Sequence, residues 1–273
     1  MGNRIGIIAG SGLFPFLLAR SLKAKGEEIY VISVEKEVEP RLFSLSSQFL
    51  QIWPGEMSRF LQFVKENKID KVFLAGKVDP LWLLRNQSFD SLACKLWPEK
   101  GPATASVIIE ILINFLKEQG IEVLDPSPFL EPFFCQPGYL TRHQPSPEAR
   151  NDLELAFDLA LKMADLEIGQ VVAVKKGVIV SVEALEGTDK MIKRAGELAG
   201  EGMVVAKVGR TRQSLIVDVP AVGLATVRSL LEARAACLVI EAGKVAFFEK
   251  EEALALAEQA GLAIVARKRE GER

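Results

Sequence analysis

The sequence predicts two α/β domains, an N-terminal Rossmann-like domain with a mostly parallel sheet and a C-terminal domain of mixed α/β structure. Three observations support this fold class. A glycine-rich turn follows a short apolar run at the N-terminus, six prolines fall between positions 126 and 147, and strand and helix patterns alternate again after that stretch. We expect domains at 1–135 and 148–273, joined by a proline-rich linker at 136–147.

The first domain opens with the strand–turn–helix pattern of a nucleotide-binding unit. The further predicted elements are strands at 28–34, 71–75 and 121–124 and helices at 58–67 and 103–118, whereas residues 40–55 look irregular. Residues 4–9 form the apolar first strand, Gly10, Ser11 and Gly12 the turn, and residues 13–25 the helix.

Two glycine turns of the first domain are candidate phosphate contacts. Gly10, Ser11 and Gly12 follow the first strand, while Gly76 and Lys77 follow the strand at 71–75. Ligands bind at the carboxyl ends of strands in open α/β sheets. Pro15 stands where the last glycine of the dinucleotide fingerprint would be, which disfavours an NAD site. The alternative is that these turns need glycine only for their backbone shape.

The second domain is expected to begin with a helix over residues 148–164. A hairpin (170–174 and 178–183), strands at 203–208, 215–218, 236–240, 245–248 and 262–266, and helices at 188–199, 224–234 and 250–260 follow. The charged tail from Arg267 to Arg273 is expected to be frayed.

Residues Glu186, Gly187, Thr188 and Asp189 join the hairpin to the next helix. Gly187 permits a tight turn, and Thr188 is a good helix N-cap, so this stretch is explained by local structure alone. The functional alternative is that backbone N–H groups at the helix start hold an anion while Glu186 or Asp189 helps to bind a metal ion.

Composition excludes several classes of site. The chain of 273 residues has 34 basic and 36 acidic residues, so no basic surface for nucleic acid is expected. His143 is the only histidine, which argues against histidine-based catalysis and multi-histidine zinc sites. Cys94, Cys135 and Cys237 are scattered, and there is neither an apparent signal segment nor an apolar span, so we expect a cytoplasmic protein.

Several charged residues of the second domain fall at strand ends or helix starts. Besides Glu186 and Asp189 they include Lys207, Asp218 and the arginines of a polar loop, Arg210 and Arg212. Carboxylates with nearby cations suit Mg²⁺-assisted chemistry at a phosphate. The alternative is a set of solvated charges on loops.

The order of these motifs resembles the single-chain UDP-2,3-diacylglucosamine pyrophosphatases of lipid A biosynthesis. The resemblance runs nearly end to end, through IAGSGLFP at 8–15, AGKV at 75–78, EGTD at 186–189 and DVPAVG at 218–223. It implies hydrolysis of the pyrophosphate of the lipidated UDP-sugar to UMP and 2,3-diacylglucosamine 1-phosphate (lipid X), with Mg²⁺ or another divalent cation.

The resemblance implies that Asp218 is the essential aspartate and that Lys207 matches a lysine of the family. We further expect Asp189 and Lys207 to be catalytic residues beside Asp218, and Asp218, Glu186 and Asp189 to be the metal ligands. Substrate contacts are expected from Gly10, Ser11, Gly12, Gly76, Lys77, Gly187, Thr188 and Gln213. Two departures bear on activity: Ile216 stands where relatives often have arginine, and residues 100–104 replace a Gly-Asp-Asp cluster.

Other functions fit the same sequence. One is a nucleotide-sugar or dinucleotide-binding module without hydrolase activity, and another is a structural protein that binds a partner.

A substrate with two acyl chains implies transient contact with the membrane surface, at the inner face of the inner membrane. The charged helix faces are compatible with a monomer or a homodimer.

Overall fold

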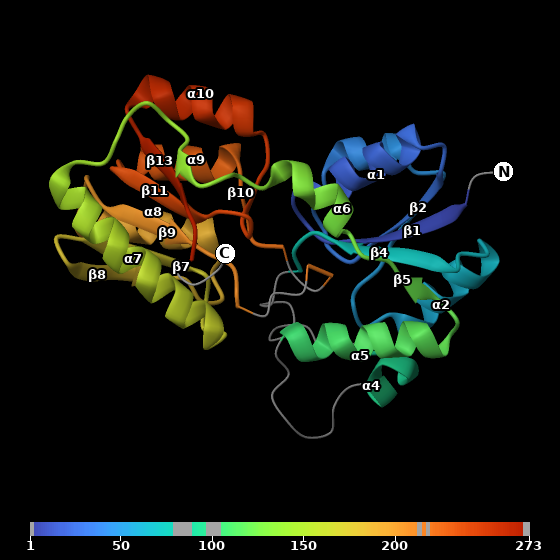
Figure 1. Cartoon of the computed structure of the whole chain (residues 1–273). Coiled ribbons are helices and arrows are strands. Elements are labelled where there is room, and N and C mark those ends of the chain that lie inside the picture. Colours follow the sequence, from blue (N-terminus) through green and yellow to red (C-terminus); the bar gives the residue numbers. More distant parts are fainter. Residues whose placement is uncertain (1–2, 79–88, 97–104, 212–214, 217–218, 270–273) are drawn as a thin grey trace. The chain divides into compact units, whose positions relative to one another are not determined.

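The computed structural model describes residues 3–78, 89–96, 105–211, 215–216 and 219–269. The chain divides into two compact units, one formed by residues 1–129 together with 214–218 and the other by 130–213 together with 219–273. Both units are α/β, which confirms the predicted fold class (Figure 1).

Unit 1 contains a sheet of five strands in the order β3-β2-β1-β4-β5, and all of its strand pairs are parallel. The elements are β1 (Arg4–Ala9), α1 (Phe14–Ala24), β2 (Glu28–Ser33), η1 (Pro40–Leu45), β3 (Gln48–Gln51), α2 (Met57–Glu66), β4 (Lys71–Ala75), α4 (Ser91–Leu96), α5 (Ala105–Glu118), β5 (Glu122–Val123) and α6 (Ser127–Leu130). This strand order is that of a Rossmann-like sheet.

Helices lie on both sides of the unit 1 sheet. Figure 1 shows α1 on one side and α5 on the other. Phe60 of α2 and Phe115 of α5 are buried in one core cluster with Ile8 and Val72 of the sheet. The expectation that residues 40–55 are irregular is wrong, because they include η1 and the edge strand β3, which pairs with β2.

Unit 2 contains a mixed sheet of six strands in the order β6-β13-β11-β9-β7-β8. Its elements, from residue 131 on, are η2 (Glu131–Phe133), β6 (Gly138–Tyr139), α7 (Pro147–Asp165), β7 (Val171–Lys175), β8 (Val178–Val182), α8 (Thr188–Ala199), β9 (Val204–Lys207), β10 (Ala221–Val222), α9 (Leu224–Glu232), β11 (Cys237–Glu241), β12 (Ala246–Phe247), α10 (Lys250–Ala260) and β13 (Ala263–Arg267). Strands β9, β11 and β13 run parallel, and β10 pairs with β12 in a small second sheet.

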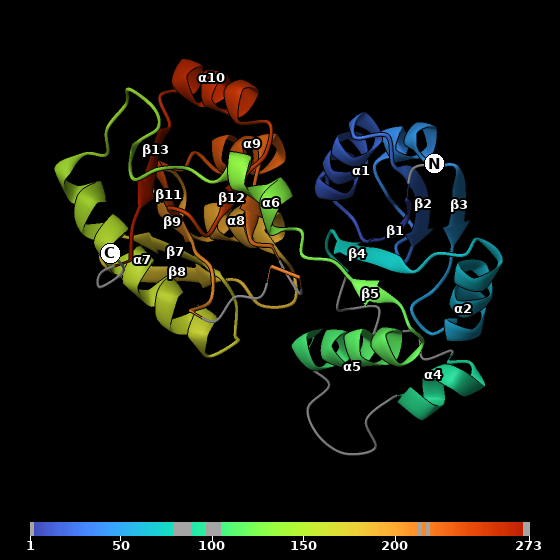
Figure 2. The ribbon, with the colours of Figure 1, turned by 45° about the vertical axis from the view of Figure 1, so that its right-hand side comes forward.

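One long helix covers one face of this mixed sheet, and three helices cover the other. Ala156 and Phe157 of α7 pack on Val172 and Val239 of the sheet. The opposite core cluster joins α8, α9 and α10. Figures 1 and 2 show these three helices on the side of the sheet away from α7. Both faces are buried, which explains why β7, β9 and β11 are almost entirely apolar.

The stretch predicted as a linker, residues 136–147, includes an ordered strand. Tyr139 and Gly138 of β6 pair with Val265 and Ala266 of β13, and the buried Thr141 hydroxyl accepts a hydrogen bond from Ile264 N. The predicted boundaries themselves stay predictions.

Asp90 connects two helices of unit 1. Its carboxylate accepts hydrogen bonds from Leu92 N (3.0 Å) and Ala93 N (2.8 Å) in α4, and from Ser58 N (2.7 Å) in α2. Burial alone would raise the pKa of Asp90, but these hydrogen bonds lower it overall. The carboxylate therefore caps both helices in its ionised form.

We expect Asp90→Ala to lower the free energy of unfolding by about 1–2 kcal/mol at neutral pH, because the cap and a link between helices are lost. A carboxylate with a lowered folded-state pKa contributes stability above its unfolded pKa, and this contribution is lost as the pH falls. Urea unfolding should therefore show the deficit of the variant narrowing below about pH 4. The exposed Asp70, changed to alanine, is the control, and an equal deficit in both variants would contradict the capping role.

Candidate functional site

The carboxyl edge of the unit 1 sheet is formed by two glycine turns in direct contact. Gly10 N donates to Ala75 O (2.8 Å), Ser11 N donates to Lys77 O (2.8 Å), and Lys77 N donates back to Ser11 O (3.0 Å). A Cβ atom on Gly10 would lie 2.5 Å from Lys77 O, and one on Gly76 would lie 2.6 Å from Ser11 O. The two turns can pack this closely only without side chains.

This packing accounts for the glycines without a ligand. The N–H groups of Gly10, Ser11 and Lys77 are already hydrogen-bonded within the protein, so they are poor candidates for cradling a phosphate. Helix α1 begins beside the turn and has Pro15 in its first turn, which removes one donor. The predicted substrate contacts of Gly10, Ser11, Gly12, Gly76 and Lys77 stay predictions, and the exposed Lys77 side chain fits such a contact better than the backbone does.

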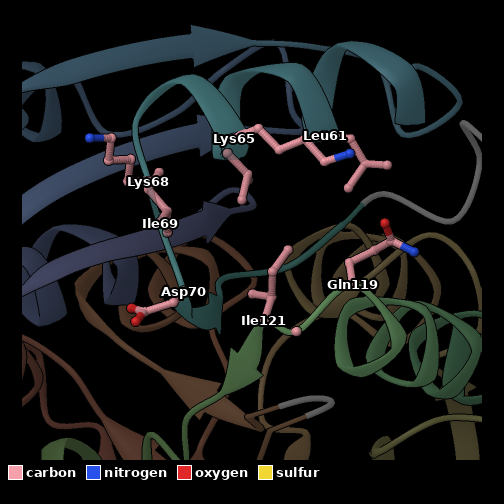
Figure 3. A pocket seen from close by; sticks show the side chains of 9 residues that line it. Leu61, Lys65, Lys68, Ile69, Asp70, Gln119 and Ile121 are labelled. Carbon is pink, nitrogen blue, oxygen red and sulfur yellow. The ribbon is translucent and has the colours of Figure 1, made fainter.

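A pocket of about 370 Å³ lies at the opposite edge of the same sheet (Figure 3). Its lining includes Lys65, Lys68, Asp70, Gln119 and Ile121. These residues come just before β4 and β5 or from the end of α2, so the pocket lies at the amino ends of the strands. It is therefore separate from the edge where the sequence predicts the nucleotide.

In unit 2 the predicted Lys207 and Thr188 do come together. Lys207 Nζ donates to Thr188 Oγ1 at 2.8 Å, and the same hydroxyl donates to Glu183 Oε1 at 2.8 Å. The other carboxylate oxygen of Glu183 accepts from Gln170 N at 3.2 Å. Lys207 and Glu183 are only 8% exposed, so a cation and an anion are buried on either side of one threonine hydroxyl.

The local fold explains this arrangement. Lys207 is the last residue of β9, Glu183 follows β8, and Thr188 is the first residue of α8. The expectation that Thr188 caps this helix is wrong: Gly187, with φ of 84°, occupies the N-cap position without a side-chain cap. The Thr188 hydroxyl bonds to Glu183 instead. Glu183 is the member of this site that sequence reasoning missed.

Glu186 and Asp189, two expected metal ligands, lie in different surroundings. Glu186 pairs with Arg194 and accepts from Ala184 N (3.1 Å). Burial alone would raise the pKa of Glu186, but hydrogen bonds from its own N–H, from Arg194 and from Ala184 N lower it overall. Asp189 is exposed in the first turn of α8. Arg194 thus already neutralises Glu186, which makes Glu186 the weaker candidate ligand.

The other metal and substrate candidates cannot be placed. Asp218 and Gln213 lie outside the described residues. Within the parts of the chain that the structure describes, no group of three or more His, Cys, Asp or Glu side chains could hold a metal ion.

A second buried charged group lies at the carboxyl edge of the unit 2 sheet. Glu241, fully buried at the end of β11, accepts from Gly209 N (2.8 Å) and from Arg269 Nε (3.0 Å). Burial raises the pKa of Glu241, although Gly209 N and Arg269 oppose the shift. Arg269 is therefore firmly packed, and the expectation of a tail frayed from Arg267 onward is wrong for Arg267, the last residue of β13, and for Arg269.

These features define a two-domain α/β protein whose second unit gathers buried charged side chains at one sheet edge. The model of the LpxI N-terminal domain matches residues 4–133, and the model of the LpxI C-terminal domain matches residues 136–265. The chain belongs to the LpxI family.

One curated relative covers almost the whole chain. This chain is 27% identical to the UDP-2,3-diacylglucosamine pyrophosphatase LpxI of Caulobacter vibrioides, over 96% of this chain and 97% of the relative. Solved structures are more distant. The GalE-like L-threonine dehydrogenase from Cupriavidus necator is 10% identical over 98% of this chain and 86% of its own, with a TM-score of 0.34. N5-carboxyaminoimidazole ribonucleotide synthetase from Thermotoga maritima is 13% identical over 66% of this chain and 41% of its own, with a TM-score of 0.28.

In the described part of the chain, no helix is both long enough and apolar enough to cross a bilayer.

Proposed function

We propose that this chain hydrolyses the pyrophosphate bond of UDP-2,3-diacylglucosamine, releasing UMP and 2,3-diacylglucosamine 1-phosphate. The observation that carries the proposal is the match of both LpxI domain models, in order, over residues 4–133 and 136–265. The Caulobacter relative, which is named for this activity, spans both domains as well.

The geometry of unit 2 supports chemistry at a phosphate. Lys207 is a buried ammonium group held on the Thr188 hydroxyl, beside the start of a helix. A fixed cation at a dry site stabilises the negative charge that develops on phosphoryl oxygens, at little cost in reorganisation. The N–H groups at the start of α8 add a partial positive charge at the same place. We therefore assign Lys207 to transition-state stabilisation and Thr188 to substrate contact.

Our proposal includes a divalent cation such as Mg²⁺. Asp218 and Asp189 are the carboxylates that we assign to it, with Glu186 as the weaker third candidate because it pairs with Arg194. When bound, such an ion lowers the pKa of a water ligand and neutralises phosphoryl charge. Mg²⁺ often uses only one or two protein carboxylates and takes its other ligands from phosphate and water.

A direct test is UMP release from UDP-2,3-diacylglucosamine by the purified protein, with Mg²⁺ and with EDTA, beside Asp218→Ala. We expect release that needs both the ion and Asp218, with a loss of at least about 100-fold in the variant. A folded protein that releases no UMP but is stabilised by UDP would instead support a nucleotide-sugar-binding module. Ile216 and residues 100–104 would then be the first positions to examine.

The proposed substrate also implies contact with a membrane surface, because its two acyl chains are anchored in a bilayer. We propose a transient, peripheral association. Sedimentation with vesicles that contain the substrate tests it: recovery of the protein in the pellet only with substrate-loaded vesicles is expected, and none in the pellet would contradict it.

A further inference from the structure

The buried Glu241 fixes the backbone at the point where β9 ends. Its Oε2 accepts from Gly209 N at 2.8 Å, and its Oε1 accepts from Arg269 Nε at 3.0 Å. Gly209 comes two residues after Lys207, and Lys207 is in register with Ile240, the neighbour of Glu241. The Glu241 carboxylate therefore holds the end of the strand that carries Lys207.

Arg269 holds the same backbone from the other side. Its Nη2 donates to Gly209 O at 3.0 Å, and its Nη1 donates to Thr211 Oγ1. Thr211 is fixed further by Asp165 at the end of α7, which accepts from Thr211 N and from its hydroxyl, each at 2.7 Å. We call Gly209, Thr211, Asp165, Glu241 and Arg269 the β9-end network.

The network also lies next to Pro220, close to the start of β10. A Cβ atom on Gly209 would lie 3.5 Å from Pro220 Cγ. Pro220 O accepts from Ala246 N at 2.9 Å, just before β10 pairs with β12. Gly209 and Pro220 are thus packed together, and both are hydrogen-bonded to the sheets of unit 2.

The buried charges of the β9-end network contribute little to the stability of the fold for the desolvation that they require. Glu241 is fully buried, and the Arg269 side chain is 13% exposed. Burying an ion pair usually stabilises a fold less than apolar residues of the same volume would, whereas it defines one geometry well. A planar guanidinium with several donors in a fixed fork can hold a carboxylate, a carbonyl and a hydroxyl at once, and lysine cannot.

We propose that Arg269 and Glu241 are positioning residues for the proposed phosphate chemistry: they fix the end of β9, and with it the place of Lys207. This inference rests on the proposed function. Displacement of a catalytic group by about 1 Å costs roughly 100-fold in rate, so the network should act on turnover rather than on substrate affinity.

The test compares Arg269→Lys and Thr211→Val with Arg267→Lys. Arg269→Lys keeps the positive charge but loses the planar guanidinium with its several donors. Thr211→Val removes the hydrogen bonds of the Thr211 hydroxyl to Asp165 and Arg269 and leaves the buried Glu241–Arg269 ion pair in place. Arg267 lies two residues before Arg269 and pairs with Glu154 on α7, so it is the matched control. We expect kcat for UMP release to fall about 10- to 100-fold in Arg269→Lys and by a smaller factor in Thr211→Val. In both variants KM should stay within about threefold of the wild-type value. In Arg267→Lys, kcat should stay within about twofold of the wild-type value.

A second readout does not depend on hydrolase activity. Trypsin cleavage after Arg210, seen as a fragment of residues 1–210, should be faster in Arg269→Lys than in the wild type or in Arg267→Lys, because the strand end opens more often. Unchanged kcat and unchanged cleavage in Arg269→Lys would overturn the inference, as would losses equal to those of Arg267→Lys. If the wild type releases no UMP, the proposed function fails, and the cleavage rate alone decides whether the network fixes the strand end.

Discussion

Replacing Lys207 with methionine is expected to lower kcat for UMP release by about 100-fold or more, because removing one fixed group that stabilises transition-state charge typically has an effect of that size. Methionine fills nearly the same volume, so packing at the end of β9 is kept. Glu183 retains its hydrogen bonds from Thr188 Oγ1 and Gln170 N, which limits the loss in the free energy of unfolding to about 1–3 kcal/mol.

Lys175→Met is the matched control for this experiment. Lys175 is a partly buried lysine on the adjacent strand β7, where its Nζ donates to Ala199 O at 2.6 Å. Initial rates of UMP release and thermal unfolding would be measured for both variants. If Lys207→Met retained turnover close to that of Lys175→Met, Lys207 would be a structural cation, and its assigned role in catalysis would have to be withdrawn.

Most of the fold could be predicted because the apolar pattern of each element is local. Strands β1, β4 and β9 are short runs of β-branched and apolar residues, and both faces of their sheets are covered. Strand β3 was missed, since Gln48–Gln51 is an edge strand with polar ends and little alternation. Such a strand is defined by its pairing with β2 rather than by its own sequence.

The candidate site could be predicted only in part. Lys207 and Thr188 were each expected to be site residues, and the structure joins them at 2.8 Å. Glu183 was missed because a polar residue at the end of a hairpin strand normally faces solvent. It is buried here because Gly169 lets the chain before β7 pack directly against it.

The β9-end network shows a different limit. Glu241 ends an apolar strand, and Arg269 lies in a charged tail, 28 residues further along the chain. Charge in a tail is usually solvated, and no local pattern distinguishes the one arginine that folds back. Glu241 is the residue from which the network could have been predicted, since a carboxylate that ends a buried strand requires a partner.

Gly169→Ala is expected to give a large loss of stability in unit 2. A Cβ atom at this position would lie 2.0 Å from Glu183 O and 2.8 Å from Glu183 C. Both are backbone atoms, so neither can rotate away, and the segment before β7 must separate from the segment after β8. Forced repacking of this kind costs about 3 kcal/mol or more, which corresponds to roughly 6–12 °C in the melting temperature of a unit of this size.

The same displacement should reach the site. Separating Gly169 from Glu183 moves Gln170 N away from the Glu183 carboxylate, and the Thr188 hydroxyl then loses its fixed partner. Gly223→Ala is the control, because its backbone is extended and a Cβ atom there would meet its nearest neighbour at an ordinary 3.5 Å. Thermal and urea unfolding should show the large loss for Gly169→Ala and a change within about 0.5 kcal/mol for Gly223→Ala. Equal midpoints in the two variants would mean that the Gly169–Glu183 contact relaxes easily, and that Glu183 is held in place by Thr188 and Lys207 rather than by the backbone around it.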